Sequence, residues 1–192
     1  MHDTEIISPA SQAEWRAWLM KNHLSSANVW LIFYKKKSDK HNFTWSAAVD
    51  EALCFGWVDS RRKPVDEESF IQFFCKRKAL STWSEINKAK VANLIETEQM
   101  MPAGLTAINI GKENGSWNFL DDIDALVLPA DLKLAFEQQS GTLEYYSNLS
   151  KSVKKSILQW LKFSKTDKTR KKRIIEIVSA AALQGVPSAI RR

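Results

Sequence analysis

Tryptophan is distributed unevenly along this chain, and the distribution limits how the chain can fold. Seven of the eight tryptophans precede residue 118, and only Trp160 follows it. A composition shift of this size indicates two modules. The junction falls within residues 115–129, where glycine, the acidic patch Asp121-Asp122-Ile123-Asp124 and Pro129 interrupt the apolar periodicity. We therefore expect two domains, over residues 1–118 and 119–192.

Capping signals and apolar patterns predict an α+β first domain. Ser11 and Glu14 form a capping-box pattern, in which each side chain satisfies a backbone donor near the other. Gly56 stands where a helix would end in the left-handed conformation. The predicted helices cover 11–22, 46–55, 82–98 and 102–115, and the predicted strands cover 29–34, 57–65 and 70–76. We expect a small antiparallel sheet of about three strands, packed with helices.

The second domain, residues 119–192, shows only helical patterns. Apolar residues recur at i, i+4, i+7 and i+8 from Val153 and again from Ile174. The predicted helices cover 131–138, 142–148, 150–163 and 167–184. We expect an all-helical carboxy-terminal module that is basic in character.

Several classes of protein are excluded by the sequence. Its 192 residues are 44% hydrophobic and 26% charged, as in ordinary globular proteins. The longest apolar runs are about six residues, far below the roughly 20 that cross a bilayer. The amino-terminal residues Met1, His2, Asp3, Thr4 and Glu5 include acids where a secretory signal would carry bases, so we expect a cytoplasmic protein.

Neither a metal nor a cofactor is expected. Two cysteines and three histidines show no spacing typical of a zinc site, and the chain has no glycine-rich phosphate loop. We expect Cys54 and Cys75 to be buried free thiols rather than a disulfide, as is usual in a reducing compartment. No nucleophile or Cys/His spacing of a known catalytic signature occurs, and we expect a protein without enzymatic activity.

The segment after Gly56 carries the strongest candidate for ligand binding. On a regular strand Trp57, Asp59 and Arg61 share one face, and Val58, Ser60 and Arg62 share the other. The ligand-binding candidates are Trp57, Asp59, Arg61 and Trp83. They would form a polar pocket floor beneath two tryptophans, with Arg61 binding an anion.

A plainer interpretation of the same segment stays open. In a hairpin centred on Glu67, Asp59 lies opposite Cys75 and within diagonal reach of Arg77. The acid would then form a cross-strand ion pair on a solvated sheet edge, worth under about 1 kcal/mol.

Positive charge is concentrated in the second domain. The net charge is +6, and residues 119–192 hold 13 Lys and Arg against 8 Asp and Glu. The anion-binding candidates are Lys168, Arg170, Lys171, Lys172 and Arg173. They open the last predicted helix, where the helix dipole disfavours cations, so nucleic acid or an anionic surface is a possible partner. A solvated helix face is the alternative, and nucleic acid is not the favoured partner.

Several blocks of the sequence resemble the YdeI/OmpD-associated, bacteriocin-protection family. They are residues 30–36 (WLIFYKK), 51–62 (EALCFGWVDSRR), 83–87 (WSEIN), 101–104 (MPAG) and 149–185, the last corresponding to an OmdA-type carboxy-terminal domain. The resemblance implies a role in bacteriocin or stress protection but brings no catalytic motif. We therefore expect a binding protein for an anionic or aromatic small molecule or protein, with nucleic-acid or anionic-surface binding by the basic helices as the alternative.

Overall fold

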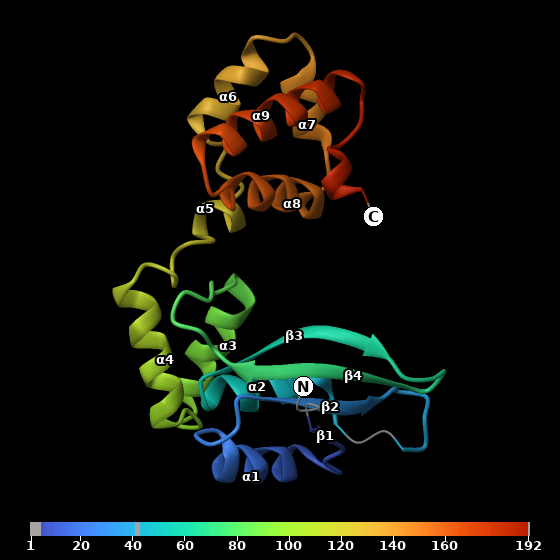
Figure 1. Ribbon diagram of the computed structural model, residues 1–192, viewed down its shortest axis with the longest axis vertical. Coiled ribbons are helices and arrows are strands. Elements are labelled where there is room, and N and C mark those ends of the chain that lie inside the picture. The colour runs from blue at the N-terminus through green and yellow to red at the C-terminus, as the bar shows by residue number, and fades with distance from the viewer. Residues whose placement is uncertain (1–4, 41–42, 192) are drawn as a thin grey trace. The chain divides into compact units, whose positions relative to one another are not determined.

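The computed structural model describes residues 5–40 and 43–191, and it divides the chain into two compact units, Met1–Phe119 and Leu120–Arg192 (Figure 1). Each unit buries its own cluster of apolar side chains. The first residues, from which we inferred the absence of a signal peptide, and two of the three histidines, His2 and His41, lie outside the described part of the chain.

The amino-terminal unit is α+β, as expected, but its sheet is mixed. Its elements are β1 (Ile6–Ile7), α1 (Gln12–Asn22), β2 (Asn28–Tyr34), α2 (Trp45–Cys54), β3 (Trp57–Pro64), β4 (Ser69–Lys76), α3 (Glu85–Glu96) and α4 (Pro102–Glu113). The strand order is β1-β2-β4-β3, with β1 parallel to β2 and the other pairs antiparallel. The expectation of about three antiparallel strands therefore missed β1, which has two residues and is too short to show a strand pattern.

The predicted helix starts depend on side-chain caps. The Ser11 hydroxyl accepts a hydrogen bond from the Glu14 amide at 3.2 Å, as the capping box requires. Helix α3 begins later than predicted, because Ser84 and not Thr82 caps it by accepting from the Asn87 amide. Gly56 has a φ of +70° after α2, in agreement with its predicted left-handed conformation.

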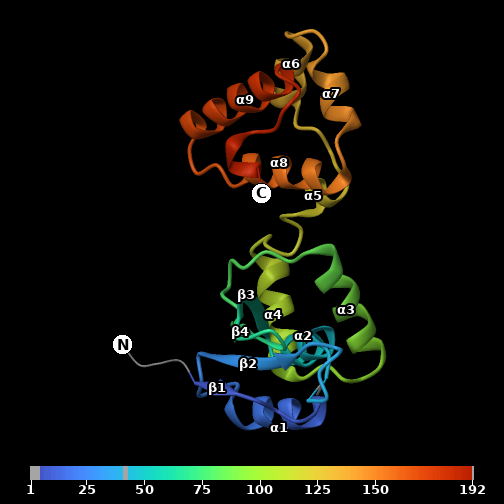
Figure 2. The same ribbon diagram turned by 90° about the vertical axis from the view of Figure 1, so that its right-hand side faces the viewer.

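The core of this unit lies on one side of the sheet. Helices α2, α3 and α4 lie on that side of the strands (Figure 2). The buried cluster joins Trp15 of α1, Leu31 of β2, Leu53 of α2 and Phe74 of β4, all at most 1% exposed. The opposite side of the sheet contributes no residue to this cluster.

The carboxy-terminal unit is helical, as predicted. Its elements are α5 (Asp121–Asp124), α6 (Ala130–Glu137), α7 (Thr142–Asn148), α8 (Lys151–Lys162), α9 (Asp167–Ala182) and a 3-10 turn, η1 (Ser188–Ile190). The predicted apolar stripes pack together, with Ile157 and Leu161 of α8 against Ile177 and Val178 of α9 in one cluster. Sequence analysis missed α5, because its acidic residues resembled a linker.

Tyr146 on α7 provides a test of this core. Its hydroxyl is buried without a hydrogen-bond partner among the described residues, and burial raises its pKa to about 12. Because an unpaired buried hydroxyl costs free energy, Tyr146→Phe should stabilise the unit by up to about 1 kcal/mol. The folded state keeps the phenol proton more tightly than the unfolded state, so wild-type stability should fall as the pH rises from 10 to 12. Urea denaturation of both proteins measures this, and a clear loss of stability in the variant would contradict it.

Two further findings bear on the expectations from composition. Within residues 5–40 and 43–191, no helix combines the length and the apolar character needed to span a membrane. Cys54 is buried, Cys75 is partly buried, and both thiols are free. Burial raises the pKa of the Cys54 thiol.

Candidate functional site

A β-bulge in β3 changes which residues share a face of the sheet. Asp59 pairs with Phe74 and Arg62 pairs with Gln72, so two residues of β3 oppose one of β4. The extra residue moves Arg62 onto the side of Asp59 and turns Arg61 to the opposite side. The predicted grouping on one face holds for Trp57 and Asp59 but is wrong for Arg61, and the predicted pairing of Asp59 with Cys75 is displaced by one residue.

The two predicted tryptophans are core residues. Trp57 is fully buried, packs edge-on against Trp18 and donates through Nε1 to the His23 carbonyl at 3.4 Å. Trp83 is 1% exposed, and its ring centroid lies 3.6 Å from the guanidinium carbon of Arg77. Trp57 contributes to the wall of a cavity, whereas Trp83 lies behind Arg77.

Asp59 forms a polar cluster and not the predicted surface ion pair. Its Oδ2 accepts hydrogen bonds from Trp45 Nε1 and Gln72 Nε2, both at 3.1 Å. Burial raises the pKa of the Asp59 carboxyl, while the charges of Arg77 and Arg62 act to lower it. Asp59 therefore lies near Arg77 without a direct hydrogen bond to it among the described residues.

A cavity of about 230 Å³ opens where β3 begins and β4 ends. Three consecutive cations, Lys76, Arg77 and Lys78, contribute to its wall together with His23 and the Gly56 backbone. Apolar side chains from Phe55, Trp57 and helix α4 line the rest, and none of the lining residues is acidic. The cavity is smaller than the ~300–1,000 Å³ typical of drug-sized sites, so it suits a small molecule.

Arg77 is the most perturbed group at this cavity. Its Nη1 donates to the Thr82 carbonyl at 2.9 Å, but its Nε and Nη2 are buried without partners among the described residues. Burial lowers its pKa to about 10, and the nearby Asp59 charge offsets part of that effect. A buried guanidinium with incomplete hydrogen bonding favours an anion in its vicinity.

Glycine holds the cavity wall in place. A side chain at Gly56 would approach the Ala103 carbonyl oxygen at 2.8 Å and Ala107 Cβ at 3.2 Å. One turn of helix α4 therefore lies directly against the α2–β3 connection, and it contributes Ala103, Thr106 and Ala107 to the cavity. The left-handed backbone of Gly56 turns the chain sharply enough for this contact.

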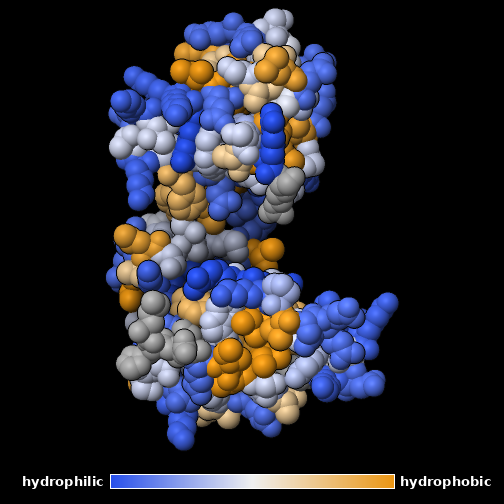
Figure 3. Space-filling model, turned by 45° about the vertical axis from the view of Figure 1, so that its right-hand side comes forward, coloured by the Kyte–Doolittle hydropathy of each residue, from blue (hydrophilic) through white to orange (hydrophobic). Residues whose placement is uncertain are grey.

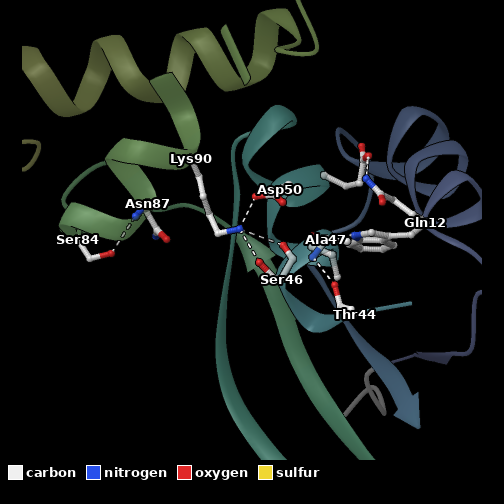
Figure 4. A network of polar contacts seen from close by, with 11 residues as sticks. Gln12, Thr44, Ser46, Ala47, Asp50, Ser84, Asn87 and Lys90 are labelled. Carbon is white, nitrogen blue, oxygen red and sulfur yellow. Dashed lines mark hydrogen bonds and ion pairs between the residues drawn. The ribbon is translucent and has the colours of Figure 1, made fainter. Parts of the chain in front are cut away.

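Polar contacts hold helix α2 on two sides, from α3 and from α1 (Figure 4). Lys90 of α3 reaches Asp50 at 2.5 Å and the Ser46 hydroxyl at 2.8 Å. On the side of α1, the buried Glu51 carboxylate accepts hydrogen bonds from Gln12 at 2.7 Å and Arg16 at 2.6 Å. These contacts hold α2 in position. Because Gly56 lies just beyond the end of this helix, they also fix the position of the cavity wall at Gly56.

The predicted anion-binding cluster of α9 is divided by the structure. Arg170 forms a two-point ion pair with Asp131 of α6, at 2.6 and 2.8 Å. Arg173 donates to the Trp160 carbonyl and lies over the Trp160 ring. Three exposed lysines complete the predicted set, namely Lys168, Lys171 and Lys172. Two of the five candidates therefore stabilise the helical unit itself.

Sequence analysis missed most of the cavity. Of the four ligand-binding candidates, Trp57 alone lines it, and the cations at 76–78 and His23 were not among them. The informative signal was the basic triplet at 76–78, where β4 ends. Its partner strand β3 begins just after Gly56, so the triplet and the glycine lie at the same end of the hairpin. Within the described residues, no group of three or more His, Cys, Asp or Glu is arranged to bind a metal.

The fold and the cavity define a two-unit protein with an α+β amino-terminal part, a cation-lined cavity and a helical carboxy-terminal part. Residues 7–107 match the family described as a domain of unknown function (DUF8412), and the chain belongs to this family. Residues 125–184 match the family described as Bacteriocin-protection, YdeI or OmpD-Associated (OmdA). This confirms the resemblance for the carboxy-terminal unit, whereas all four amino-terminal blocks fall within the other match. No curated protein and no solved structure matches the chain.

Proposed function

We propose that the amino-terminal unit binds a small organic anion in the cavity beside Gly56 and leaves it chemically unchanged. The observation that carries this proposal is Arg77, a buried guanidinium with two unpaired nitrogens at a cavity lined by two further cations and no acid. A carboxylate or phosphate would compensate that charge. The apolar wall suits an aliphatic or aromatic body attached to the anionic group.

The biological setting of the proposal comes from the second unit. The OmdA family is described by bacteriocin protection, and we extend that role to this chain. Binding would then be linked to bacteriocin or stress protection in the cytoplasm, and the free thiols Cys54 and Cys75 support a reducing compartment.

The proposal predicts charge-selective binding. Indole-3-acetate and its neutral analogue indole-3-acetamide share one shape and differ in charge. Indole-3-acetate should bind at least tenfold more tightly in isothermal titration, a difference of about 1.4 kcal/mol. Arg77→Met keeps an unbranched side chain but removes the charge, and it should abolish that preference. Lys78→Gln changes an exposed side chain and should weaken binding without threatening the fold.

Lys112→Gln on α4 is the matched control, because this exposed lysine does not line the cavity. It should bind both compounds as the wild type does. Equal affinity for acid and amide, or an unchanged preference in both Arg77→Met and Lys78→Gln, would refute the proposal. Conversion of either compound by the wild-type protein would refute its non-enzymatic part.

The alternative function, binding of nucleic acid or an anionic surface through α9, has less support. Three exposed lysines remain for it, since Arg170 and Arg173 are engaged within the helical unit. Exposed lysines on a helix are also what solubility requires.

A further inference from the structure

The side of the sheet that faces away from the core carries an organised surface. We call it the open sheet face. Strand pairing places eight residues on it, namely Ile6, Trp30, Ile32, Val58, Lys63, Ile71, Phe73 and Cys75. Arg61, in the bulge, joins them over the rings of Phe73 and Trp30. None of them belongs to the buried core cluster, and the helices lie on the other side of the strands (Figure 2). Figure 3 shows apolar side chains gathered on this unit and bordered by hydrophilic ones.

Apolar side chains form the middle of the open sheet face. Ile6 is 55% exposed, and Ile32, Ile71 and Phe73 are each partly exposed. Ile32 lies directly opposite Ile71 on the paired strands, which makes a continuous aliphatic strip. Contiguous exposed apolar surface on a sheet indicates contact with another polypeptide.

Two cations are fixed above the aromatic side chains of this face. The Arg61 guanidinium lies 4.9 Å from the Phe73 ring centroid and 5.8 Å from that of Trp30. The Lys63 ammonium lies 5.0 Å from the Trp30 ring. Neither cation forms an ion pair with a described residue, so both retain donors for a partner. The β-bulge is what brings Arg61 to this side of the sheet.

The chemistry of the face selects one kind of partner. We propose that the open sheet face binds an acidic, amphipathic segment of another protein, whose apolar side chains pack on Ile32 and Ile71. Its carboxylates would pair with Arg61 and Lys63. No carboxylate belongs to the face itself, so the partner has to supply the negative charge.

Other occupants fit the face less well. Single-stranded nucleic acid needs open aromatic rings for stacking, but Trp30 is only 8% exposed and is covered by two cations. A second copy of this chain in a symmetric dimer would place the face against itself, and the face has no carboxylate to pair with Arg61 or Lys63.

The test uses a designed 18-residue helical peptide with leucine at i, i+3, i+4 and i+7 and glutamate elsewhere. Fluorescence anisotropy should show binding at least tenfold tighter than for the same peptide with glutamine in place of glutamate. Arg61→Gln should weaken binding at least fivefold, and Ile71→Asn should do the same. Arg62→Gln is the matched control, because the neighbouring Arg62 points to the core side and should leave the affinity unchanged.

Several results would overturn the proposal. One is equal binding of the glutamate and glutamine peptides, and another is wild-type affinity in Arg61→Gln. If a twelve-nucleotide oligothymidylate bound more tightly than the glutamate peptide, and Arg61→Gln abolished that binding, the face would be a nucleic-acid surface. Dimerisation that Ile71→Asn abolishes would assign the face to a second copy. Indole-3-acetate binding should be unchanged in Arg61→Gln, so this test and the cavity test fail independently.

Discussion

Replacing Gly104 by alanine is expected to lower the free energy of unfolding of the amino-terminal unit by about 3 kcal/mol. A Cβ at this position of α4 would lie 2.4 Å from the Cys54 carbonyl oxygen and 2.7 Å from that of Leu53. Both obstacles are backbone atoms of α2, so the clash can be relieved only by separating the two helices. In a solvent-exposed helix without a close neighbour, the same substitution would instead raise the free energy of unfolding by about 1 kcal/mol.

Urea denaturation followed by tryptophan fluorescence measures this effect, since seven of the eight tryptophans belong to this unit. Asn109→Ala on the exposed side of the same helix is the control, and it should be neutral or slightly stabilising. If Gly104→Ala were as stable as this control, the close packing of α2 on α4 would be incorrect. The variant should also lose indole-3-acetate binding, because α4 forms one wall of the cavity.

Arg16→Leu is expected to destabilise the same unit by about 3 kcal/mol, because it leaves the Glu51 carboxylate buried without its cation. The Glu51 side chain is 6% exposed, and the ion pair is 2.6 Å long. Arg16 also donates to the Gln99 carbonyl at 2.9 Å, which ties α1 to the segment before α4. Among the described residues, the Gln12 amide alone would remain hydrogen-bonded to the carboxylate.

A double-mutant cycle separates two contributions to the loss of stability: the loss of the Arg16–Glu51 ion pair, and the cost of leaving the Glu51 charge buried without a partner. The variant with Arg16→Leu and Glu51→Leu together should recover most of the stability lost by Arg16→Leu alone, since both charges are gone. Lys21→Leu, an exposed position on the same helix, should change stability by less than about 0.5 kcal/mol. The assignment of a buried ion pair would be contradicted if the stability changes of Arg16→Leu and Glu51→Leu simply added up in the double variant. It would also be contradicted if Arg16→Leu and Lys21→Leu changed the free energy of unfolding equally.

Local signals predicted most of the elements because each depends on a few neighbouring residues. Helix starts and ends depend on residues within one turn. The helices capped by Ser11 and Ser150 begin where the sequence indicated, and the left-handed turn at Gly56 also lies at its predicted place. The exceptions are instructive. Strand β1 has two residues and gains its structure from pairing with β2, so no local pattern marks it. Helix α5 has four residues, three of them acidic, and it depends on Ile123 packing into the core of the second unit.

The candidate site was less predictable, because it depends on contacts between distant segments. Alternation along β3 placed Arg61 beside Trp57, but the bulge opposite Phe73 reversed its direction. The bulge also gives the open sheet face one of its two cations, since it brings Arg61 over Phe73 and Trp30. A register shift of one residue changes the face of every later side chain, and only strand pairing determines it.

The sequence by itself determined most of the helical and strand segments, the basic character of the second unit and the resemblance to a bacteriocin-protection family. These follow from residue spacing and composition, which act locally and are visible in one dimension. The tertiary structure alone decided which cations surround the cavity, which tryptophans are core, and which arginine faces outward. Those outcomes depend on burial. An arginine guanidinium on the surface is solvated by water, whereas the Arg77 guanidinium beside Trp83 is buried with two nitrogens that lack hydrogen-bond partners among the described residues.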